Sequence, residues 1–407
     1  MSLGTFLDPY WTDWLNLLIR WLHVIAAIAW IGASFYFVLL DQSLEEPKSA
    51  DDVHDGVGGE LWEIHGGGFY HVKKYRVAPP TLPEHIAWFK WEAYTTWLSG
   101  FALMVVLYYF NANAYLIDRS VADLTSWEAV AISIGLLVVA WITYDLLCRL
   151  LVGRGRNGEI ALWVLILLLT TLAAWGCGQL FQPRAAFLQV GAMIGTIMAG
   201  NVFFNIIPAH WELINAKKAG RDPDPTPGIV AKQRSVHNNY FTLPVLFTML
   251  AGHFAFTYGA GRAWLVLIAI MLLGVLSRVF FNLRHQGRTI WALPAVGVAG
   301  VLVLAWALHP DDKVGGAATA AVSFSRVAPV IEQRCAPCHA ESPTEPGFSS
   351  PPAGIVLETP QQIAAHAAEI KTLIAAKVMP QGNLTGMTSE ERALVVAWVT
   401  QGASTAK

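Results

Sequence analysis

The residues best suited to chemistry are two cysteines and a histidine in the segment Cys335-Ala336-Pro337-Cys338-His339. Two thiols at this spacing, followed at once by histidine, form the attachment pattern of a c-type haem. Both thiols can then form thioethers with the two vinyl groups of one porphyrin, and the imidazole can bind the iron. A zinc half-site or a redox C-x-x-C is the alternative, but a zinc site needs a second pair of ligands, and Cys148 and Cys177 lie in apolar runs. We therefore expect one covalent haem c on Cys335 and Cys338, with His339 as an axial iron ligand and a role in electron transfer.

The sixth ligand of this iron is expected to be Met379, in the segment Met379-Pro380-Gln381-Gly382-Asn383. It follows a predicted helix, where an extended segment can bring a thioether to the open face of the iron. Met387 is the competing methionine, but it adjoins a predicted helix start at Thr388. Ligation by methionine and histidine raises the reduction potential of a haem, which suits an electron acceptor.

A small polar domain is expected to position these ligands. After His309 the sequence changes to Pro-Asp-Asp-Lys and a Gly/Ala-rich stretch, which indicates a linker over 310–322 and a domain over 323–407. So short a domain has little core of its own, and a haem would supply much of its apolar interior. The domain resembles a small monohaem class I cytochrome c. Its expected helices lie near 324–336, from the N-cap Thr359 and Pro360 to about Lys377, and from the capping box of Thr388 and Glu391.

Residues 1–309 have the composition of a membrane protein. The chain is 55% hydrophobic and only 14% charged, with 17 Trp, which is too apolar for a soluble protein of this length. Apolar runs of about 20 residues recur, and this length crosses a hydrocarbon core of about 30 Å. We predict an all-α fold in which an eight-span transmembrane bundle precedes the cytochrome c domain. The expected spans are 14–40, 86–110, 127–148, 160–181, 186–208, 240–258, 263–282 and 290–308.

Basic residues in the loops indicate how the bundle is oriented in the lipid bilayer. One set of alternate loops contains only Arg119, Arg184 and Arg262. Because basic loops stay in the cytoplasm, we expect the N-terminus and the cytochrome c domain on the periplasmic face of a bacterial inner membrane, where cytochrome c also matures. The other set of loops holds Lys48, Lys73, Lys74, Arg76, Arg149, Arg154, Arg156, Lys217, Lys218, Arg221, Lys232, Arg234, Arg284 and Arg288.

Two histidines lie within predicted spans on the outer side of the bundle. By the rise of 1.5 Å per residue, His23 is about 14 Å from the outer end of the first span and His253 about 8 Å from the outer end of the sixth. They could share a site, either a b-type haem held by both imidazoles or a substrate pocket. Hydrogen bonding between helices is the structural alternative and explains many membrane histidines.

Other polar residues of this domain have both a functional and a structural interpretation. Asp145 and Arg278 lie in the inner halves of their spans, and a charge in lipid needs a partner, so they are expected to pair. The loop segment Glu60–Tyr75 mixes imidazole, aromatic and basic groups around three glycines; it could cover a planar anion or remain a solvated loop. Amides able to hydrogen-bond a ligand are also present, although amides near helix ends are common: Asn201, Asn205, Asn239 and Gln233.

The chain resembles the bacterial membrane urate oxidases, also called urate hydroxylases, which carry a fused cytochrome c. The resemblance covers nearly the whole chain and rests on the segments Arg20–Gly32, His65–Tyr75, Gly200–Pro208 and His237-Asn238-Asn239, together with the fused architecture. It implies an oxidoreductase of purine catabolism that converts urate to 5-hydroxyisourate. It also implies that electrons pass through the haem to a terminal cytochrome oxidase or another respiratory acceptor.

Other classes of function make different predictions. A quinol-oxidising electron-transfer subunit without an organic substrate would contain b haems and would be reduced by quinol. A haem-based sensor or anchor would have an open or weak sixth position on the iron, against which Met379 argues. No nucleotide-binding, hydrolase or metalloprotease motif is found in the sequence, and no nucleic-acid partner is expected.

Overall fold

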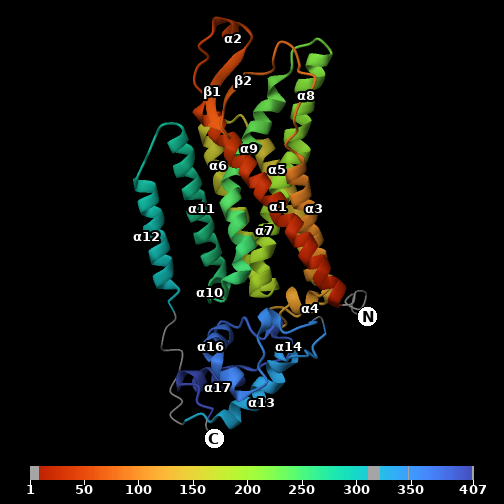
Figure 1. Cartoon of the computed structure of the whole chain (residues 1–407), viewed down its shortest axis with the longest axis vertical. Coiled ribbons are helices and arrows are strands. Elements are labelled where there is room, and N and C mark those ends of the chain that lie inside the picture. The colour runs from red at the N-terminus through yellow and green to blue at the C-terminus, as the bar shows by residue number, and fades with distance from the viewer. Residues whose placement is uncertain (1–8, 310–320, 347, 406–407) are drawn as a thin grey trace.

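The computed structural model describes residues 9–309, 321–346 and 348–405, which are mostly helical. A long helical bundle is followed by a small C-terminal domain at one of its ends (Figure 1). Most of the linker expected over 310–322 lies outside the described residues. The all-α prediction therefore holds for most of the chain, with one exception near residue 60.

The bundle consists of long helices that run along its length, joined by shorter elements. The long helices are α1 (Pro9–Ser43), α3 (Trp91–Leu103), α5 (Ser126–Leu151), α6 (Gly155–Leu180), α7 (Pro183–Gly200), α9 (Pro225–Leu250), α11 (Ala263–His285) and α12 (Ala292–Ala307). The shorter elements are α2 (Ala50–His54), the π-helices η2 (Met104–Tyr109) and η3 (Asn201–Ile206), α4 (Ala112–Tyr115), α8 (Ile207–Lys218), the 3₁₀ turn η4 (Ala251–His253) and α10 (Ala255–Tyr258).

Among the residues that the structure describes, five helical segments are long and apolar enough to cross a membrane, and they coincide with five of the eight predicted spans. They are Trp11–Ser43, Ser126–Leu151, Gly155–Leu180, Pro183–Lys218 and Ala263–His285. The other three predicted spans fall on helical structure that lacks the required length or hydropathy. α3 changes to the π-helix η2 after 13 residues, α9 begins with a polar half, and α12 has only 16 residues.

The outer surface of the bundle is apolar, as a lipid environment requires. No described residue of α12 is buried, and its Val296, Leu302 and Trp306 are exposed. Inside the bundle, small residues let helices approach closely. A Cβ on Gly191 would stand 2.0 Å from Thr248 Oγ1, and one on Gly200 would stand 1.9 Å from Trp141 Nε1.

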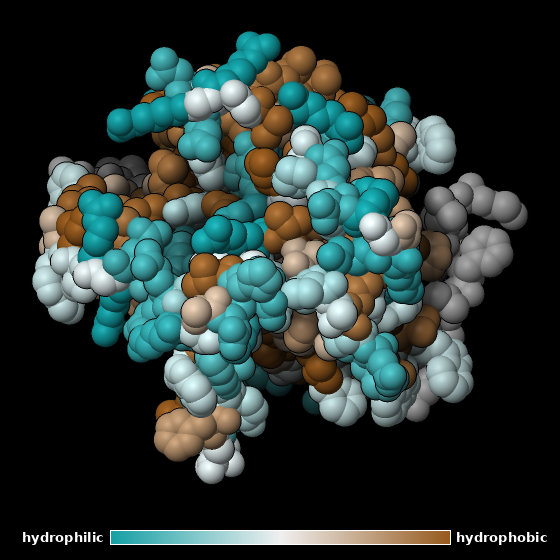
Figure 2. Space-filling view, turned by 90° about the horizontal axis from the view of Figure 1, so that it is seen from above, coloured by the Kyte–Doolittle hydropathy of each residue, from teal (hydrophilic) through white to brown (hydrophobic). Residues whose placement is uncertain are grey.

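The two ends of the bundle differ in character. The N-terminal end of α1, α4 and α10 lie at the end that faces the C-terminal domain, whereas α2, the β-strands and the end of α8 lie at the opposite end (Figure 1). We call the latter the hairpin end. Figure 2 views the molecule from this end and shows hydrophilic residues gathered over much of it, with hydrophobic residues between them.

The segment expected to be a loop around three glycines is a β-hairpin, so that expectation is wrong. Strands β1 (Val57–His65) and β2 (Gly68–Tyr75) pair antiparallel, with His65 opposite Gly68. Gly66 and Gly67 form the two-residue turn with φ of 58° and 85°, the left-handed conformation that tight hairpins require at both positions. An ion pair between Lys74 on β2 and Asp41 on α1 joins the hairpin to the bundle, and Asp41 also pairs with Lys232 on α9.

The C-terminal domain contains the predicted helix starts, but its second helix is interrupted. Thr359 and Thr388 each cap a helix through a capping box, with Gln362 and Glu391 respectively, as the sequence predicts for Thr388. A break at His366 divides the expected helix 359–377 in two. The helices are α13 (Phe324–Arg334), α14 (Ala336–His339), α15 (Pro360–Ala365), α16 (Ala367–Ala375) and α17 (Ser389–Thr400). The core that joins them includes Val327, Ile331, Ile374, Val395 and Trp398.

Candidate functional site

The C-terminal domain contains an apolar cavity of about 220 Å³ on which the predicted haem residues converge. Cys335, Cys338 and His339 line it from α13 and α14, and Met379 lines it from the segment after α16. Apolar side chains complete the walls: Phe348, Ile355, Leu357, Ile370, Leu373, Ile374 and Leu384. An apolar cavity beside two thiols, an imidazole and a thioether has the donor set that a covalent haem c requires.

The imidazole of His339 is oriented by the main chain. Its Nδ1 lies 3.0 Å from the carbonyl oxygen of Ile355, and the amide of Leu357 donates to the His339 carbonyl at 2.7 Å. A ring whose Nδ1–H donates to a carbonyl leaves Nε2 as the free ligand atom, which is the usual arrangement of a metal-binding histidine.

The two methionines near α17 occupy different environments. Met379 lines the cavity, and its carbonyl accepts a hydrogen bond from Arg392, which also donates to Asn383 Oδ1 at 2.9 Å. Met387 is 3% exposed in the domain core, away from the cavity lining, and its amide donates to Asn383 Oδ1 at 3.1 Å. Position therefore favours Met379 as a ligand at this cavity, and iron ligation by it stays a prediction.

The thiols of Cys335 and Cys338 lie in the apolar surroundings of this cavity. Burial raises the pKa of the Cys335 thiol to about 12 and that of Cys338 to about 11. Redox-active cysteines usually have depressed pKa values instead. The described residues also contain no group of three or more His, Cys, Asp or Glu side chains placed to hold a metal ion. A haem iron takes only two axial ligands from the protein, so the cavity meets its requirement without such a group.

The cavity faces the helical bundle through α4 and the 3₁₀ turn η6 (Gln381–Asn383). Gly382 in η6 has a φ of 56°, and a Cβ there would stand 2.7 Å from the Ile117 carbonyl oxygen and 3.1 Å from that of Asn113. The ring of Phe348, which lines the cavity, lies 6.4 Å from that of Tyr115 on α4. The turn beside Met379 is therefore packed directly on the bundle.

A row of aromatic rings continues from this contact into the bundle. Tyr115 lies 5.9 Å from Tyr108, whose neighbour Tyr109 lies 6.2 Å from Phe101. Phe101 stacks in turn on Trp97 at 5.4 Å. Tyr108 and Tyr109 are both buried in the π-helix η2, and π-helical turns occur frequently at functional sites.

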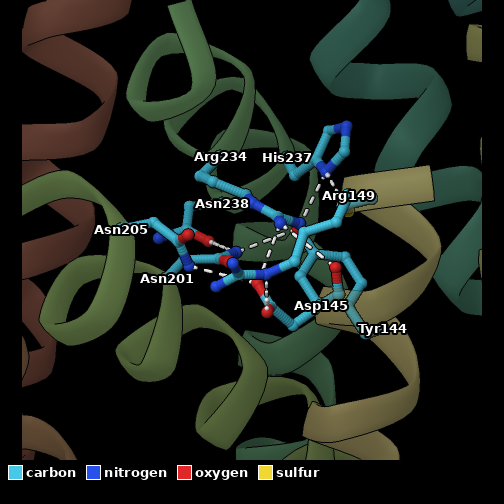
Figure 3. A network of polar contacts seen from close by, with 9 residues as sticks. Tyr144, Asp145, Arg149, Asn201, Asn205, Arg234, His237 and Asn238 are labelled. Carbon is cyan, nitrogen blue, oxygen red and sulfur yellow. Dashed lines mark hydrogen bonds and ion pairs between the residues drawn. The ribbon is translucent and has the colours of Figure 1, made fainter. Parts of the chain in front are cut away.

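A second group of polar residues lies inside the bundle, between α5, η3 and α9 (Figure 3). Asp145 is at its centre. Its Oδ1 lies 2.8 Å from Arg234 Nη2 and 3.3 Å from Asn205 Nδ2, and its Oδ2 lies 2.6 Å from Arg149 Nε. Arg234 is only 1% exposed, so this pair is buried.

Neutral polar side chains extend this polar cluster. Asn201 Nδ2 donates to the Tyr144 oxygen at 3.0 Å and to Asn238 Oδ1 at 2.9 Å. The Tyr144 hydroxyl lies 2.8 Å from His237 Nδ1 (Figure 3). Because the phenol oxygen accepts from Asn201, its own proton can be donated to Nδ1, which places the His237 proton on Nε2. We define the polar cluster as Tyr144, Asp145, Arg149, Asn201, Asn205, Arg234, His237 and Asn238.

The expected pair of Asp145 with Arg278 is wrong. Arg278 on α11 donates to Asn239 Oδ1 at 3.0 Å and to Asn282 Oδ1 at 2.9 Å, and its guanidinium lies 4.1 Å from the centre of the Phe35 ring. Asp145 instead pairs with Arg234, which the sequence predicts to lie in a basic loop. α9 begins at Pro225, so Arg234 lies within the helix and not in the loop before it.

The structure does not bring His23 and His253 together. His23 Nδ1 lies 3.0 Å from the Thr96 carbonyl oxygen and 3.2 Å from Ser99 Oγ on α3. His253 is exposed in η4. Among the described residues there is no hydrogen bond or ring contact between the two histidines. A shared b-type haem or substrate pocket stays a prediction that this arrangement does not support.

The remaining sequence candidates are distributed over several places. The ring of His71 stacks on Trp62 at 4.1 Å and its Nε2 lies 2.8 Å from Glu60, so these side chains of the hairpin pair with one another. Asn239 belongs to the Arg278 network, while Gln233 Oε1 is buried without a partner. Sequence reasoning missed Tyr144 and the pairing of Arg234. Because Arg234 lies in the polar first half of α9, the local sequence carries no signal that it is buried.

Comparison with known proteins assigns the bundle to a family. The sequence model of the urate oxidase N-terminal family matches residues 9–309, and the match stops before the C-terminal domain. No curated protein and no solved structure matches the chain. The matched region includes the polar cluster and α4, and it covers more than half of the sequence. The chain therefore belongs to the urate oxidase N-terminal family.

Proposed function

We propose that the protein is a membrane-bound oxidoreductase that oxidises urate to 5-hydroxyisourate and passes the electrons through its C-terminal haem c domain to a respiratory acceptor. One observation carries this proposal. In a single chain, a urate oxidase N-terminal domain is followed by a domain whose apolar cavity collects Cys335, Cys338, His339 and Met379. The first part indicates the substrate class and the second indicates an electron acceptor.

The reaction balances without molecular oxygen. Urate and water give 5-hydroxyisourate, two protons and two electrons, so water supplies the hydroxyl oxygen. The membrane domain must therefore bind urate, admit one water and release two protons. An acceptor that takes one electron at a time must be used twice for each urate oxidised.

The residues of the C-terminal cavity would hold haem c in a defined way. Cys335 and Cys338 would form the thioethers to the two vinyl groups. His339 would bind the iron through Nε2 while Ile355 holds its Nδ1, and Met379 would supply the sixth ligand. When bound, the haem supplies a one-electron acceptor whose potential is raised by Met/His ligation.

The packing of η6 on α4 supports transfer of electrons within the chain. The wall of the cavity that contains Phe348 lies against Tyr115, and the aromatic row from Tyr108 to Trp97 begins there. Aromatic side chains of the bundle thus come close to the cavity without an intervening partner protein. This contact favours a fused internal acceptor over a cytochrome that collects electrons from elsewhere.

We also propose that all eight predicted spans cross a bacterial inner membrane and that the cytochrome c domain is periplasmic. Five of them have the required length and hydropathy. The N-terminal end of α1 and the C-terminal domain lie at the same end of the bundle, and the hairpin with Lys73 and Lys74 lies at the other (Figure 1). Basic residues mark the cytoplasmic side of a membrane protein, which supports this orientation.

Anaerobic addition of urate to membranes that contain the oxidised protein tests the proposal. We expect the absorbance bands of reduced haem c to appear, and a Cys335→Ser/Cys338→Ser variant in the same membranes to show no such change. A haem that stays oxidised with urate but is reduced by a quinol would contradict the proposal and favour a quinol-oxidising subunit.

A further inference from the structure

We propose that the polar cluster is the urate-binding site and that urate reaches it from the hairpin end of the bundle, with Arg234 and Asn201 as the residues that hydrogen-bond the substrate. This inference rests on the proposed function and adds a location and ligands to it. It begins from hydrogen-bonding groups that the protein itself leaves unused.

Three polar atoms without a hydrogen-bond partner belong to fully buried side chains of the polar cluster. Arg234 is 1% exposed and Asn201 is 0% exposed, yet Arg234 Nε, Arg234 Nη1 and Asn201 Oδ1 have no hydrogen-bond partner. A buried polar atom without a partner has lost its hydrogen bonds to water, which destabilises the folded protein, and more so when the group is charged. Native structures contain few such atoms, and those they contain call for an explanation. These two unused donors and one unused acceptor fit a ligand that has both hydrogen-bond acceptors and hydrogen-bond donors on its edges.

The backbone around Asn201 also departs from a regular α-helix. Asn201 and Asn205 both belong to the π-helix η3, and such turns occur frequently at functional sites. Just before it, Gly200 leaves room for Trp141, whose Nε1 is a further buried donor without a partner. Trp141 in turn packs on Phe204 with ring centres 4.6 Å apart. Planar rings and unused donors therefore gather around the same helical turn.

A groove of about 610 Å³ leads to the cluster from the hairpin end. Arg149 and Asn205 line this groove, and both contact Asp145, the partner of Arg234. Its other walls come from α8 and the start of α9. Two carboxylates also line it, but both are engaged, because Glu212 pairs with Arg221 at 2.7 Å and Asp224 caps α9 through the Thr226 amide at 2.9 Å.

The charge and shape of this site fit a planar anion. The cluster contains two guanidinium groups and one carboxylate, so it carries a net positive charge that attracts an anion. Guanidinium donors pair well with the oxygens of planar anions. Urate at neutral pH is a planar monoanion with carbonyl acceptors and ring N–H donors. Its carbonyls can accept from Arg234 Nε and Nη1, and a ring N–H can donate to Asn201 Oδ1.

The position of the cluster has a consequence for the path of the electrons. Asp145 lies 19 residues from the start of α5, or about 28 Å along the helix axis. Electrons released there must cross much of the bundle to reach the C-terminal domain. The aromatic row from Trp97 to Phe348 lies along part of that distance.

Binding of labelled urate by equilibrium dialysis tests the inference without turnover. The full-length, haem-loaded protein is placed in lipid nanodiscs under anaerobic conditions, with its haem kept reduced so that no electron can be accepted. Arg234→Lys retains a cation next to Asp145 but removes the forked donors that have no partner. We expect the Kd for urate to rise at least about tenfold, the loss expected for a charge-assisted hydrogen bond.

Arg278→Lys is the matched control, because Arg278 is a buried arginine that already donates to Asn239 and Asn282. We expect its Kd to change less than about threefold, as for a substitution remote from the site. Asn201→Ala is a second variant, expected to weaken binding about fivefold through the lost acceptor. The haem c spectrum and elution volume check that each variant is folded.

The outcomes separate this inference from the proposed function. If folded Arg234→Lys and Asn201→Ala proteins bind urate as tightly as the wild type, the site is elsewhere while the proposed function stands. If the wild type neither binds urate nor is reduced by it when oxidised, the proposed function fails and the site fails with it.

Discussion

Loss of the Asp145 carboxylate should destabilise the membrane bundle strongly. Asp145 is the partner of Arg234 at 2.8 Å, and the Arg234 side chain is only 1% exposed. Removing one member of a buried ion pair leaves an uncompensated charge, which costs about 3–5 kcal/mol. We therefore expect Asp145→Asn to lower the free energy of unfolding by about 3–5 kcal/mol, a large part of a typical total stability.

The same substitution should identify its partner in a double-mutant cycle. Asp145→Asn and Arg234→Gln are expected to couple by about 1–3 kcal/mol, because the double variant no longer holds an unpaired charge. Asp145→Asn and Arg278→Gln share no partner and should be additive within about 0.5 kcal/mol. Arg149→Gln should cost no more than about 1 kcal/mol, since the Arg149 side chain is 63% exposed.

Unfolding in mixed micelles with increasing SDS, followed by the loss of helical circular dichroism, gives these free energies. The four proteins of each cycle are compared at one protein concentration and in one lipid. Coupling between Asp145 and Arg278, with additivity between Asp145 and Arg234, would overturn the helix register on which the polar cluster depends.

Three further predictions concern the C-terminal domain. Gly382→Val should separate η6 from the bundle, because a Cβ at this φ of 56° would stand 2.7 Å from the Ile117 carbonyl oxygen. Hydrogen exchange at the α4 amides should then become faster. Unchanged exchange would mean that this contact is not required. Met379→Ala should abolish the weak methionine–iron charge-transfer band of the oxidised haem, whereas Met387→Ala should keep it, and survival of the band in Met379→Ala would identify another ligand. The Arg334 guanidinium holds the pKa of Glu391 below its usual value of 4.5, so this pair stabilises the domain above that pH and its contribution is lost as the pH falls through the depressed pKa. Arg334→Gln should therefore lower the thermal midpoint at pH 7 but change it less at pH 3, and an equal loss at both pH values would argue against the ion pair.

The features that sequence reasoning could predict are those in which neighbouring residues carry the information. Cys335, Cys338 and His339, which line one cavity, are close together in the sequence, and the helix starts at Thr359 and Thr388 depend on residues three positions apart. The length and hydropathy of a continuous run of residues are enough to predict a helix that could cross a membrane, such as α5 or α6. In each case the physical cause acts within one or two helical turns, so no knowledge of packing is needed.

The partner of Asp145 depended on packing and could not be predicted in this way. Arg234 and Arg278 both lie on helices that pack in the same bundle, and the rotation of α9 about its axis decides which of them reaches Asp145. That rotation follows from close helix contacts, including the one between Gly191 on α7 and Thr248 on α9. Hydropathy gives the length of a helix and says nothing of its rotation.

The hairpin was missed for a different reason, because its signal is present in the sequence. Gly66 and Gly67 stand between two segments rich in aromatic and β-branched residues, the usual pattern of a tight hairpin. The chemical character of its imidazole and lysine groups favoured a binding loop instead. In the structure these groups pair with carboxylates, His71 with Glu60, Lys73 with Asp52 and Lys74 with Asp41.

The central claim, that this chain moves electrons from urate into its own haem c, is tested most directly by an anaerobic titration of the purified, oxidised protein with urate in ¹⁸O-labelled water. The account predicts that one urate is consumed for every two haems reduced, that 5-hydroxyisourate carries the label, and that no hydrogen peroxide forms. A haem that remains oxidised while urate binds, or urate consumption that depends on oxygen and yields hydrogen peroxide, would contradict it.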